Sequence, residues 1–311
     1  MRPFRFGVSI WAAGSKAEWA EKARKAEDLG YQAFTVPDHL SGPFFAPMPA
    51  LVGAAEATRT LRVGTYVLNN DFWNPVLLAR EAATIGLLTE GRLELGLGAG
   101  HKATEYDQAG LRFDAGRARV ERLAESVAIV KRLLDGEQMS FAGEHFTVRE
   151  AKLHERLVLK QRPPLLIAGH GKRLLTLAGR EADIVAFAGF THRRGGAEVD
   201  RTGFRAEALD TRVGWVRAAA GERFATLELN ALVQHLSITD QPRAAADQVA
   251  AQWPGVDPTE ILSLPFMLIG SVDGIVEALL RHRQRWGISY YTMSESTMET
   301  FAPIVARLTD R

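Results

Sequence analysis

Asp38 and His39 stand side by side directly after an apolar run of the chain. Imidazole is the side chain best suited to proton transfer near neutral pH, and here a carboxylate lies next to it in the sequence. The pair therefore predicts acid–base chemistry. The structural alternative is that Asp38 caps a turn and that His39 is its solvated neighbour.

Glycines precede two further histidines. In the segment 96–101 glycines alternate with other residues up to His101, which would let a ligand approach the backbone closely. The G-x-G-x-G spacing resembles half of a dinucleotide fingerprint, which is weak support for such a site. His101 by itself is as well explained as a surface or helix-capping residue.

A second glycine-bearing stretch, Gly169-His170-Gly171, leads straight into an apolar helical pattern. A strand-to-helix turn of this kind points free N–H groups and the helix dipole outward, which suits a phosphate. A simple tight turn is the alternative. Two other loops are polar: Asn69 and Asn70 suit a turn as well as a ligand, and Arg193 and Arg194 could meet an anionic ligand or face water.

The composition narrows the classes of function. The chain has 311 residues, 46% hydrophobic and 24% charged, which is typical of a globular protein with a substantial core. Its 38 Lys+Arg and 37 Asp+Glu give a net charge of +1, so no overall field favours nucleic acid or an anionic membrane. We therefore expect a small-molecule partner, with neither nucleic acid nor membrane bound.

The absence of cysteine and of several known motifs disfavours some kinds of site and some classes of enzyme. The cysteine count of 0 removes disulfides, thiolate metal sites and cysteine nucleophiles. The sequence holds no P-loop, no HExxH, no G-x-S-x-G elbow and no acidic and histidine ligands at metal spacing, so we expect no metal site. No expected strand carries an interior lysine for a Schiff base. Hydrolases and aldolases are therefore disfavoured.

The N-terminus predicts no secretion signal. Arg2 and Arg5 are followed by alternating, strand-like residues where a signal peptide would have an unbroken apolar core. The longest apolar stretch, 261–269, contains Ser263 and Pro265 and is far too short to cross a bilayer. We expect a cytoplasmic protein.

Strand and helix patterns alternate along the chain. A period of two at residues 4–10 predicts a strand, and a Ser15–Glu18 capping box with Gly30 at the far end predicts the helix that follows. Similar units recur, with helices opened by Pro75 or carrying apolar stripes. The strands are expected at 4–10, 32–36, 61–68, 92–97, 165–168, 184–187, 226–233 and 288–292.

This alternation predicts a single (β/α)8 TIM barrel over residues 1–311, a fold that typically needs about 250 residues. The surplus is assigned to insertions near 138–150, where 141–148 reads as a hairpin, and near 240–266. A doubly wound sheet is the rival, but it would not need a strand as late as Ile288. In a barrel, loops at the carboxyl ends of the strands carry the function.

Three segments together resemble the bacterial luciferase-like family of flavin and deazaflavin oxidoreductases. They are Ala26–Tyr31 continuing to Pro37-Asp38-His39, Asn74-Pro75 through Arg80-Glu81, and Thr89–Gly100 continuing to Glu105-Tyr106. The resemblance covers nearly the whole chain, and the closest branch uses the deazaflavin coenzyme F420. It implies a (β/α)8 barrel, usually dimeric, with the cofactor ring at the carboxyl mouth.

The resemblance also implies roles for individual residues. Asp38 would bind the cofactor, and His39 would be the acid or base beside the carbon that exchanges hydride. We expect His101, where the family has an acidic residue, to share the proton transfer with His39. A non-proline cis peptide maps to Tyr66–Val67. The remaining cofactor contacts implied are Asn69, Ala99, Thr104 and the phosphate cradle Gly169, His170 and Gly171.

One departure from the family limits the substrate. In the glucose-6-phosphate dehydrogenases of this branch an acidic residue stands where this chain has His101, so a sugar phosphate is not supported. The sequence thus favours an F420-dependent oxidoreductase that transfers a hydride between the deazaflavin and a small organic substrate. The alternatives are an FMN-dependent luciferase-like monooxygenase that uses oxygen, and a flavin- or deazaflavin-binding protein without turnover.

Overall fold

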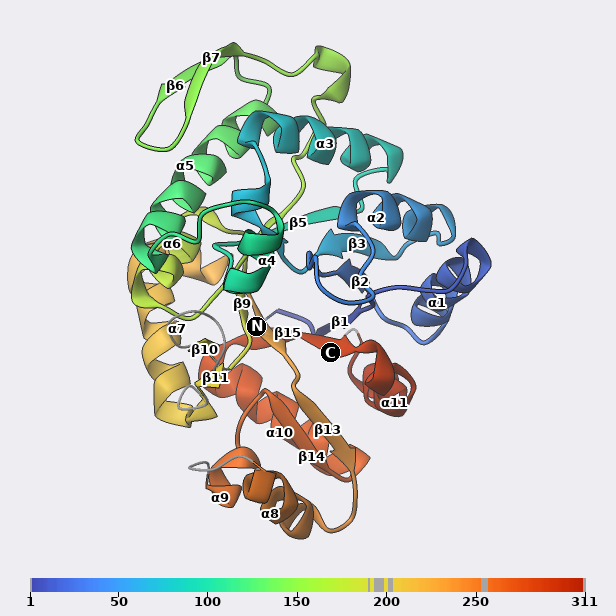
Figure 1. The fold of residues 1–311 in the computed structure, drawn as a ribbon. Coiled ribbons are helices and arrows are strands. Elements are labelled where there is room, and N and C mark those ends of the chain that lie inside the picture. The colour runs from blue at the N-terminus through green and yellow to red at the C-terminus, as the bar shows by residue number, and fades with distance from the viewer. Residues whose placement is uncertain (1, 190, 193–198, 201–203, 253–256, 310–311) are drawn as a thin grey trace. The chain divides into compact units, whose positions relative to one another are not determined.

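The computed structural model describes residues 2–189, 191–192, 199–200, 204–252 and 257–309. Strands and helices alternate along the chain (Figure 1). The residues group into two compact units. The first unit comprises Met1–Ser9, Lys25–Gln32 and Gly169–Arg311, and the second comprises Ile10–Arg24 and Ala33–Ala168. Helix α1 (Lys16–Asp28) runs from the second unit into the first.

The second unit is built on parallel strands. Strand β3 pairs with β2 on one side and with β5 on the other, and β5 pairs in turn with β8 and with the short β4. These pairings make one parallel layer from segments that helices separate in the sequence. The strands are β2 (Ala33–Val36), β3 (Arg62–Thr65), β4 (Leu68–Asn69), β5 (Leu93–Gly98) and β8 (Leu165–Ala168).

Helices of the second unit begin where the sequence predicts. Asn74 accepts hydrogen bonds from Val76 N and Leu77 N, at 3.0 and 3.3 Å, and Pro75 takes the first turn of α3. Helix α3 packs against α5 (Figure 1). The elements are α2 (Pro47–Glu56), η1 (Asn70–Phe72), α3 (Pro75–Leu88), α4 (Ala103–Gln108), α5 (Gly116–Leu134) and η2 (Glu155–Leu157).

In the first unit, four parallel strands pair in the order β1–β15–β12–β9. These strands are β1 (Arg5–Ser9), β9 (Ile184–Phe187), β12 (Glu228–Leu232) and β15 (Ile288–Ser294). Between them lie an antiparallel pair, β10 (Thr191–His192) with β11 (Val199–Asp200), and a parallel pair, β13 (His235–Ile238) with β14 (Met267–Gly270). The main strands are buried along nearly their whole length.

The helices of the first unit follow the same alternation, and α6 packs on α7 while α10 packs on β14 and β15 (Figure 1). They are α6 (Lys172–Glu181), α7 (Ala206–Ala220), η4 (Gly221–Ala225), α8 (Pro242–Gln252), α9 (Pro258–Ile261), α10 (Val272–Trp286), η5 (Glu295–Thr297) and α11 (Met298–Leu308). Most of the range predicted as an insertion, 240–266, is thus helical in the part that the structure describes.

Each predicted strand is present, with one interruption. The strand expected at 61–68 is divided into β3 and β4, because the chain bends at Tyr66–Val67. The expected hairpin is the antiparallel pair β6 (Met139–Ala142) and β7 (Thr147–Ala151). Gly30 has the positive φ, +83°, that its place after α1 predicts. A single domain with insertions remains a prediction, since the contacts divide the chain into two units.

Within the described part of the chain, no helix combines the length and the apolar character needed to cross a bilayer. The expected strand and helix order of a (β/α)8 barrel is present in full. In the second unit, loops follow the carboxyl ends of β2, β4 and β5, where the barrel fold predicts functional residues.

A buried histidine predicts acid sensitivity of the first unit. His282 on α10 is 4% exposed, and its Nε2 lies 3.0 Å from the carbonyl oxygen of Ser263. Burial lowers the pKa of His282 from 6.5 to about 4, so folding favours the neutral ring. Stability is therefore full above pH 6.5 and falls as the pH drops from 6.5 towards 4, by about 2 kcal/mol between pH 7 and pH 5.

Urea unfolding of His282→Gln at pH 7 and pH 5 measures this contribution. Glutamine keeps an N–H donor for Ser263 but binds no proton, so the variant should lose about 2 kcal/mol less than the parent protein over this interval. The exposed His154→Gln serves as the matched control and should follow the parent. Equal pH dependence of all three proteins would contradict the assignment.

Candidate active site

The second unit pairs the predicted proton carrier with a buried carboxylate. Nδ1 of His39 lies 3.0 Å and 3.1 Å from the two carboxylate oxygens of Glu105. His39 follows the carboxyl end of β2, and Glu105 sits in the first turn of α4, directly after the loop that ends β5. The Glu105 side chain is 3% exposed and that of His39 is 25% exposed, so only the imidazole is open to a ligand.

The ionisation of Glu105 decides which nitrogen of His39 carries a proton. Burial alone would raise the pKa of Glu105, but hydrogen bonds from His39, Lys102 and Ser41 outweigh burial and lower the pKa below 4.5. An ionised carboxylate only accepts hydrogen bonds, so Nδ1 of His39 must donate. The neutral ring then presents Nε2 as a proton acceptor, or as a donor once it is protonated.

Two more side chains hold Glu105 in place. The ammonium group of Lys102 donates to Glu105 Oε1 at 3.0 Å and to Ser41 Oγ at 2.6 Å, and Ser41 Oγ donates to the same carboxylate oxygen at 3.0 Å. Lys102 thereby neutralises the buried carboxylate, which would be costly to leave unpaired. The result is a fixed orientation for the His39 ring.

Asp38 connects the end of β2 to β4 and to the segment that follows β4. Its Oδ2 accepts hydrogen bonds from Asn69 N and from Nε1 of Trp73, each at 3.1 Å. Burial raises the pKa of Asp38, and these two donors offset only part of that effect. Asp38 thus has a clear structural role, and its role in binding a cofactor stays a prediction.

The peptide bond between Tyr66 and Val67 is cis, as the resemblance implies. The glycines of β5 make room for this bend. A Cβ on Gly96 would collide with the carbonyl oxygen of Thr65, and a Cβ on Gly98 would lie 2.8 Å from Cγ2 of Val67. Close packing against the neighbouring strand therefore explains why glycine stands at these two positions. The partial dinucleotide fingerprint is accounted for without a bound dinucleotide.

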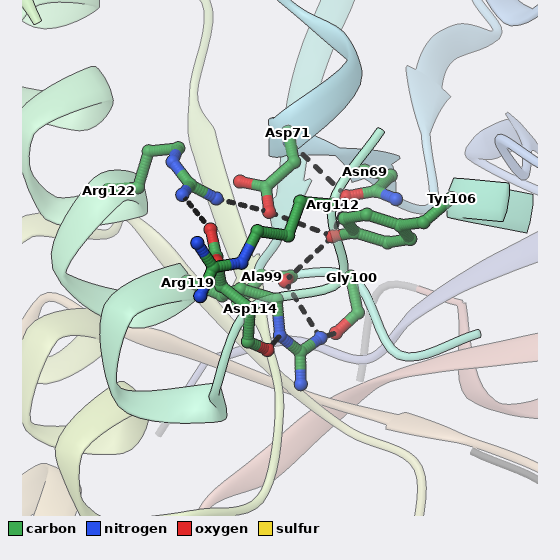
Figure 2. A network of polar contacts seen from close by, with 9 residues as sticks. All are labelled: Asn69, Asp71, Ala99, Gly100, Tyr106, Arg112, Asp114, Arg119 and Arg122. Carbon is green, nitrogen blue, oxygen red and sulfur yellow. Dashed lines mark hydrogen bonds and ion pairs between the residues drawn. The ribbon is translucent and has the colours of Figure 1, made fainter. Parts of the chain in front are cut away.

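Tyr106, next to Glu105 on α4, anchors the other side of the same loop (Figure 2). Its hydroxyl donates to Asp71 Oδ2 at 2.9 Å and lies 3.0 Å from Asn69 Oδ1. Gly100 has φ +72°, and a Cβ there would collide with this hydroxyl. Asn69 therefore uses its amide oxygen to hold the loops together, and adjacent residues of α4 fix both the His39 side and the Asn69 side.

Arginines of α5 complete this network (Figure 2). Arg119 donates to the carbonyl oxygens of Ala99, at 3.3 Å, and of Gly100. Arg122 bridges Asp71, at 2.7 Å, and Asp114. Both arginines extend from the regular helix α5. Arg119 binds the backbone carbonyls of the loop after β5, so the helix fixes the position of that loop.

The predicted phosphate cradle lies in the first unit. Gly171 is the N-cap residue of α6, no side chain caps that helix, and a Cβ on Gly171 would meet nothing within 4 Å. No side-chain cap therefore competes for the first N–H groups of α6, which leaves them as possible donors to an anion. Gly169 is fixed by packing, since a Cβ there would collide with Leu174.

The remaining predicted residues are placed as follows. His101 is exposed, and its ring centroid lies 5.6 Å from that of His39 at an interplanar angle of 89°. Thr104 is exposed on α4, while Ala99 is half-buried. Arg193 and Arg194 lie outside the described residues. The binding roles of Asp38, Tyr66, Val67, Asn69, Ala99, Thr104, Gly169, His170 and Gly171 stay predictions.

Glu105 is the residue that sequence reasoning missed. It appeared there only as part of a matching segment, and nothing in its spacing links it to His39, which lies 66 residues earlier. A usable signal exists: an acidic residue in the first turn of a short helix, just past the end of β5, would point back to the loops at the carboxyl ends of the strands.

The absence of a metal site also stays a prediction. Glu121, Glu144 and His145 place ligand atoms within 4.8 Å of one another where the β6–β7 hairpin meets α5. Glu121 is engaged by Arg117 at 2.7 Å, and Glu144 is exposed. We draw no metal chemistry from this group.

Comparison with known proteins identifies the family. Residues 1–290 match the sequence profile described as luciferase-like monooxygenase. The chain belongs to the luciferase-like monooxygenase family. The family resemblance inferred from the Asp38-His39, Asn74-Pro75 and Gly91–Gly100 segments is thereby confirmed.

Curated relatives match part of the chain. The F420-dependent glucose-6-phosphate dehydrogenase of Amycolatopsis mediterranei is 32% identical over 173 residues, which cover 52% of this chain and 50% of that protein. The chain thus spans about half the length of the curated relatives it matches.

Solved luciferase-like structures match nearly the whole chain. The coenzyme F420-dependent tetrahydromethanopterin reductase of Methanopyrus kandleri has a TM-score of 0.76 at 16% identity and covers 99% of this chain and 100% of its own. A type II Baeyer-Villiger monooxygenase of Pseudomonas putida, in complex with FMN, has a TM-score of 0.69 at 16% identity, with 99% and 96% covered. These likenesses confirm the predicted (β/α)8 barrel fold.

Proposed function

We propose that this protein is a coenzyme F420-dependent oxidoreductase that transfers a hydride between the deazaflavin and a small unsaturated or hydroxylated organic molecule. The observation that carries the proposal is the His39–Glu105 pair, in which a fixed imidazole presents one nitrogen beside the Asp38 loop. The F420 dependence of the dehydrogenase relative supports the choice of cofactor.

The residues present fit an anionic deazaflavin. The open, uncapped start of α6 at Gly171, flanked by the exposed Lys172 and Arg173, suits the phosphate of the coenzyme. In the second unit, Val67 rests on Gly96 and Gly98 and offers an apolar surface for a ring. Asp38 and Asn69 lie beside it. Within the second unit, Val67, Asp38 and Asn69 would hold the ring of the cofactor, which supplies or accepts the hydride when bound.

A side chain of the protein, His39, accepts and donates the proton of the reaction. During oxidation of an alcohol, Nε2 of His39 takes the hydroxyl proton; during reduction, the protonated ring returns it to the substrate. Glu105 accepts from Nδ1 in both directions and stabilises the positive ring, because its carboxylate stays ionised. The exposed His101, with its ring perpendicular to that of His39, is a second group that can relay the proton.

A test of the reaction class uses the purified protein without oxygen. Oxidised F420 is mixed with a panel of hydroxylated small molecules, and reduced F420 with unsaturated ones, while the visible absorbance of the deazaflavin is followed. We expect substrate-dependent change in at least one direction. Consumption of oxygen with reduced FMN, and no turnover of F420, would contradict the proposal.

The second candidate is an FMN-dependent monooxygenase. The Baeyer-Villiger monooxygenase bound to FMN supports it, because the same fold holds a flavin there. The two candidates differ in kind: a deazaflavin carries hydride but reacts poorly with oxygen. A cofactor-binding protein without turnover is the third outcome, and the intact His39–Glu105 pair favours an enzyme over it.

We propose further that the protein is a cytoplasmic homodimer that binds no nucleic acid. Helix α3 supports the dimer, because Leu77, Leu87 and Leu88 are 49%, 49% and 55% exposed on it. Exposed apolar clusters often mark interfaces between subunits. Light scattering after size-exclusion chromatography should give twice the mass of the 34.2 kDa chain, and a mass of one chain would contradict the dimer.

A further inference from the structure

A row of four rings lies beside the His39–Glu105 pair. The Trp11 and Phe44 ring centroids are 5.3 Å apart, those of Phe44 and His39 5.1 Å, and those of His39 and His101 5.6 Å. Each distance is within the range of direct ring contact. We call Trp11, Phe44, His39 and His101 the ring surface. It is continuous from an apolar end at Trp11 to the two imidazoles.

The apolar end of the ring surface is open to solvent. Trp11 is 46% exposed, and Leu40, which follows His39 in the chain, is 49% exposed. Trp11 is in ring contact with Phe44, so this exposed end of the ring surface is accessible to an apolar ligand. The imidazoles and the apolar rings would then face the same bound molecule.

The loop that carries Phe44 is built to hold this ring. Gly42 has φ +116°, and a Cβ there would lie 2.7 Å from the Phe44 ring, so the ring packs directly against a backbone that only glycine suits. The next residue, Phe45, donates its backbone N–H to the carbonyl oxygen of Trp11 at 2.9 Å. The segments carrying Trp11 and Phe44 are thus joined, and the ring surface is preformed.

The charge beside the ring surface is already neutralised. Lys102 donates to Glu105 Oε1 and to Ser41 Oγ at 3.0 and 2.6 Å, so the Glu105 carboxylate offsets its positive charge. A phosphate at Lys102 would lie next to that carboxylate, which is 3% exposed and ionised, and would be repelled by it. The chemistry of the ring surface therefore favours a neutral substrate over a phosphorylated one.

We propose that the ring surface is the substrate subsite and that it takes a neutral molecule in which an apolar ring is attached to the reacting carbinol or carbonyl carbon. The inference rests on the proposed function and names its substrate class. The aromatic group covers Trp11 and Phe44, and the oxygen of the reacting carbon meets Nε2 of His39.

In the corresponding reaction the coenzyme accepts or donates the hydride, and His39 accepts or donates the proton. Oxidation of such an alcohol breaks the carbinol C–H bond, whose electron pair leaves with the hydrogen as hydride to the deazaflavin. The O–H bond also breaks, its proton passes to His39 Nε2, and a C=O double bond forms. The reverse reaction returns hydride and proton to the carbonyl group.

Binding measurements test the subsite without turnover. Calorimetric titration of 1-(2-naphthyl)ethanol and of glucose-6-phosphate is carried out on the protein saturated with F420, and on the cofactor-free protein. We expect the aryl alcohol to bind, and Trp11→Ala and Phe44→Ala to weaken it about tenfold or more, because each removes a stacking ring. Leu280→Ala, which removes a 40% exposed leucine on α10, should have no effect.

The outcomes separate this inference from the proposed function. No binding of the aryl alcohol, equal binding by Trp11→Ala and Phe44→Ala, or tighter binding of glucose-6-phosphate would overturn the subsite even if F420 binds. Failure of F420 to bind, with the aryl alcohol still held by Trp11 and Phe44, would overturn the proposed function and leave the subsite supported. Thermal unfolding of each variant establishes that it is folded.

Discussion

Replacing His39 by alanine is expected to lower turnover with F420 by a factor of about 100 to 10,000 while leaving cofactor affinity nearly unchanged. The proposed proton transfer depends on Nε2 of this ring, and general acid–base catalysis contributes a factor of this size. The His39 side chain is 25% exposed and its ring contacts Phe44. Replacing it therefore removes few buried contacts. Steady-state kinetics and coenzyme titration of the same variant check both parts.

His154→Ala is the matched control for this experiment, since it removes an exposed imidazole distant in sequence from the candidate site. It should retain the parent turnover. A His39→Ala protein that turns over at the parent rate would remove the catalytic assignment. A variant that has lost F420 binding together with turnover would assign His39 to cofactor binding.

Replacing Glu105 by glutamine is expected to lower kcat about 100-fold with little change in KM. The carboxylate is ionised above pH 4.5, because its pKa is lowered, and it therefore holds the proton on Nδ1 of His39. A neutral amide can donate to Nδ1 as well as accept from it, so it no longer fixes the tautomer and no longer stabilises the charged ring. Glu105 thus acts as a positioning residue through His39.

The pH profile separates this role from a merely structural one. In the parent protein the His39–Glu105 pair should persist at every pH above 4.5 and weaken as Glu105 is protonated below it. The kcat of the parent protein should therefore fall below pH 4.5. In Glu105→Gln, whose kcat is already low, this fall should be absent. Glu121→Gln, on the exposed face of α5, is the control and should be unchanged. Full activity of Glu105→Gln would show that His39 needs no partner.

Much of the fold follows from local patterns. The period of two at the strands, the caps at Ser15 and Asn74 and the glycine after α1 each act within a few residues, so the sequence carries them directly. The pattern could not predict that β3 ends at Thr65, because apolar residues continue to Leu68 across the bend. It also gave no sign of the pairing between β13 and β14.

In the candidate site, too, some residues could be predicted from the sequence and others could not. His39 and Asp38 could be predicted because adjacent residues of suitable type follow a strand. Glu105 could not, since its partnership with His39 depends on the tertiary fold. The glycines of β5 were interpreted as room for a ligand, whereas Gly96 and Gly98 make room for Thr65 and Val67 of the neighbouring strand. Only the register between the strands distinguishes the two explanations.

The most direct measurement is a thermal-stability titration of the purified protein with F420 and, separately, with FMN. A ligand that binds only the folded state stabilises it by about 2.7 kcal/mol at a hundredfold excess over its dissociation constant. We expect a concentration-dependent rise in melting temperature with F420 and none with FMN. A rise with FMN alone would contradict this expectation.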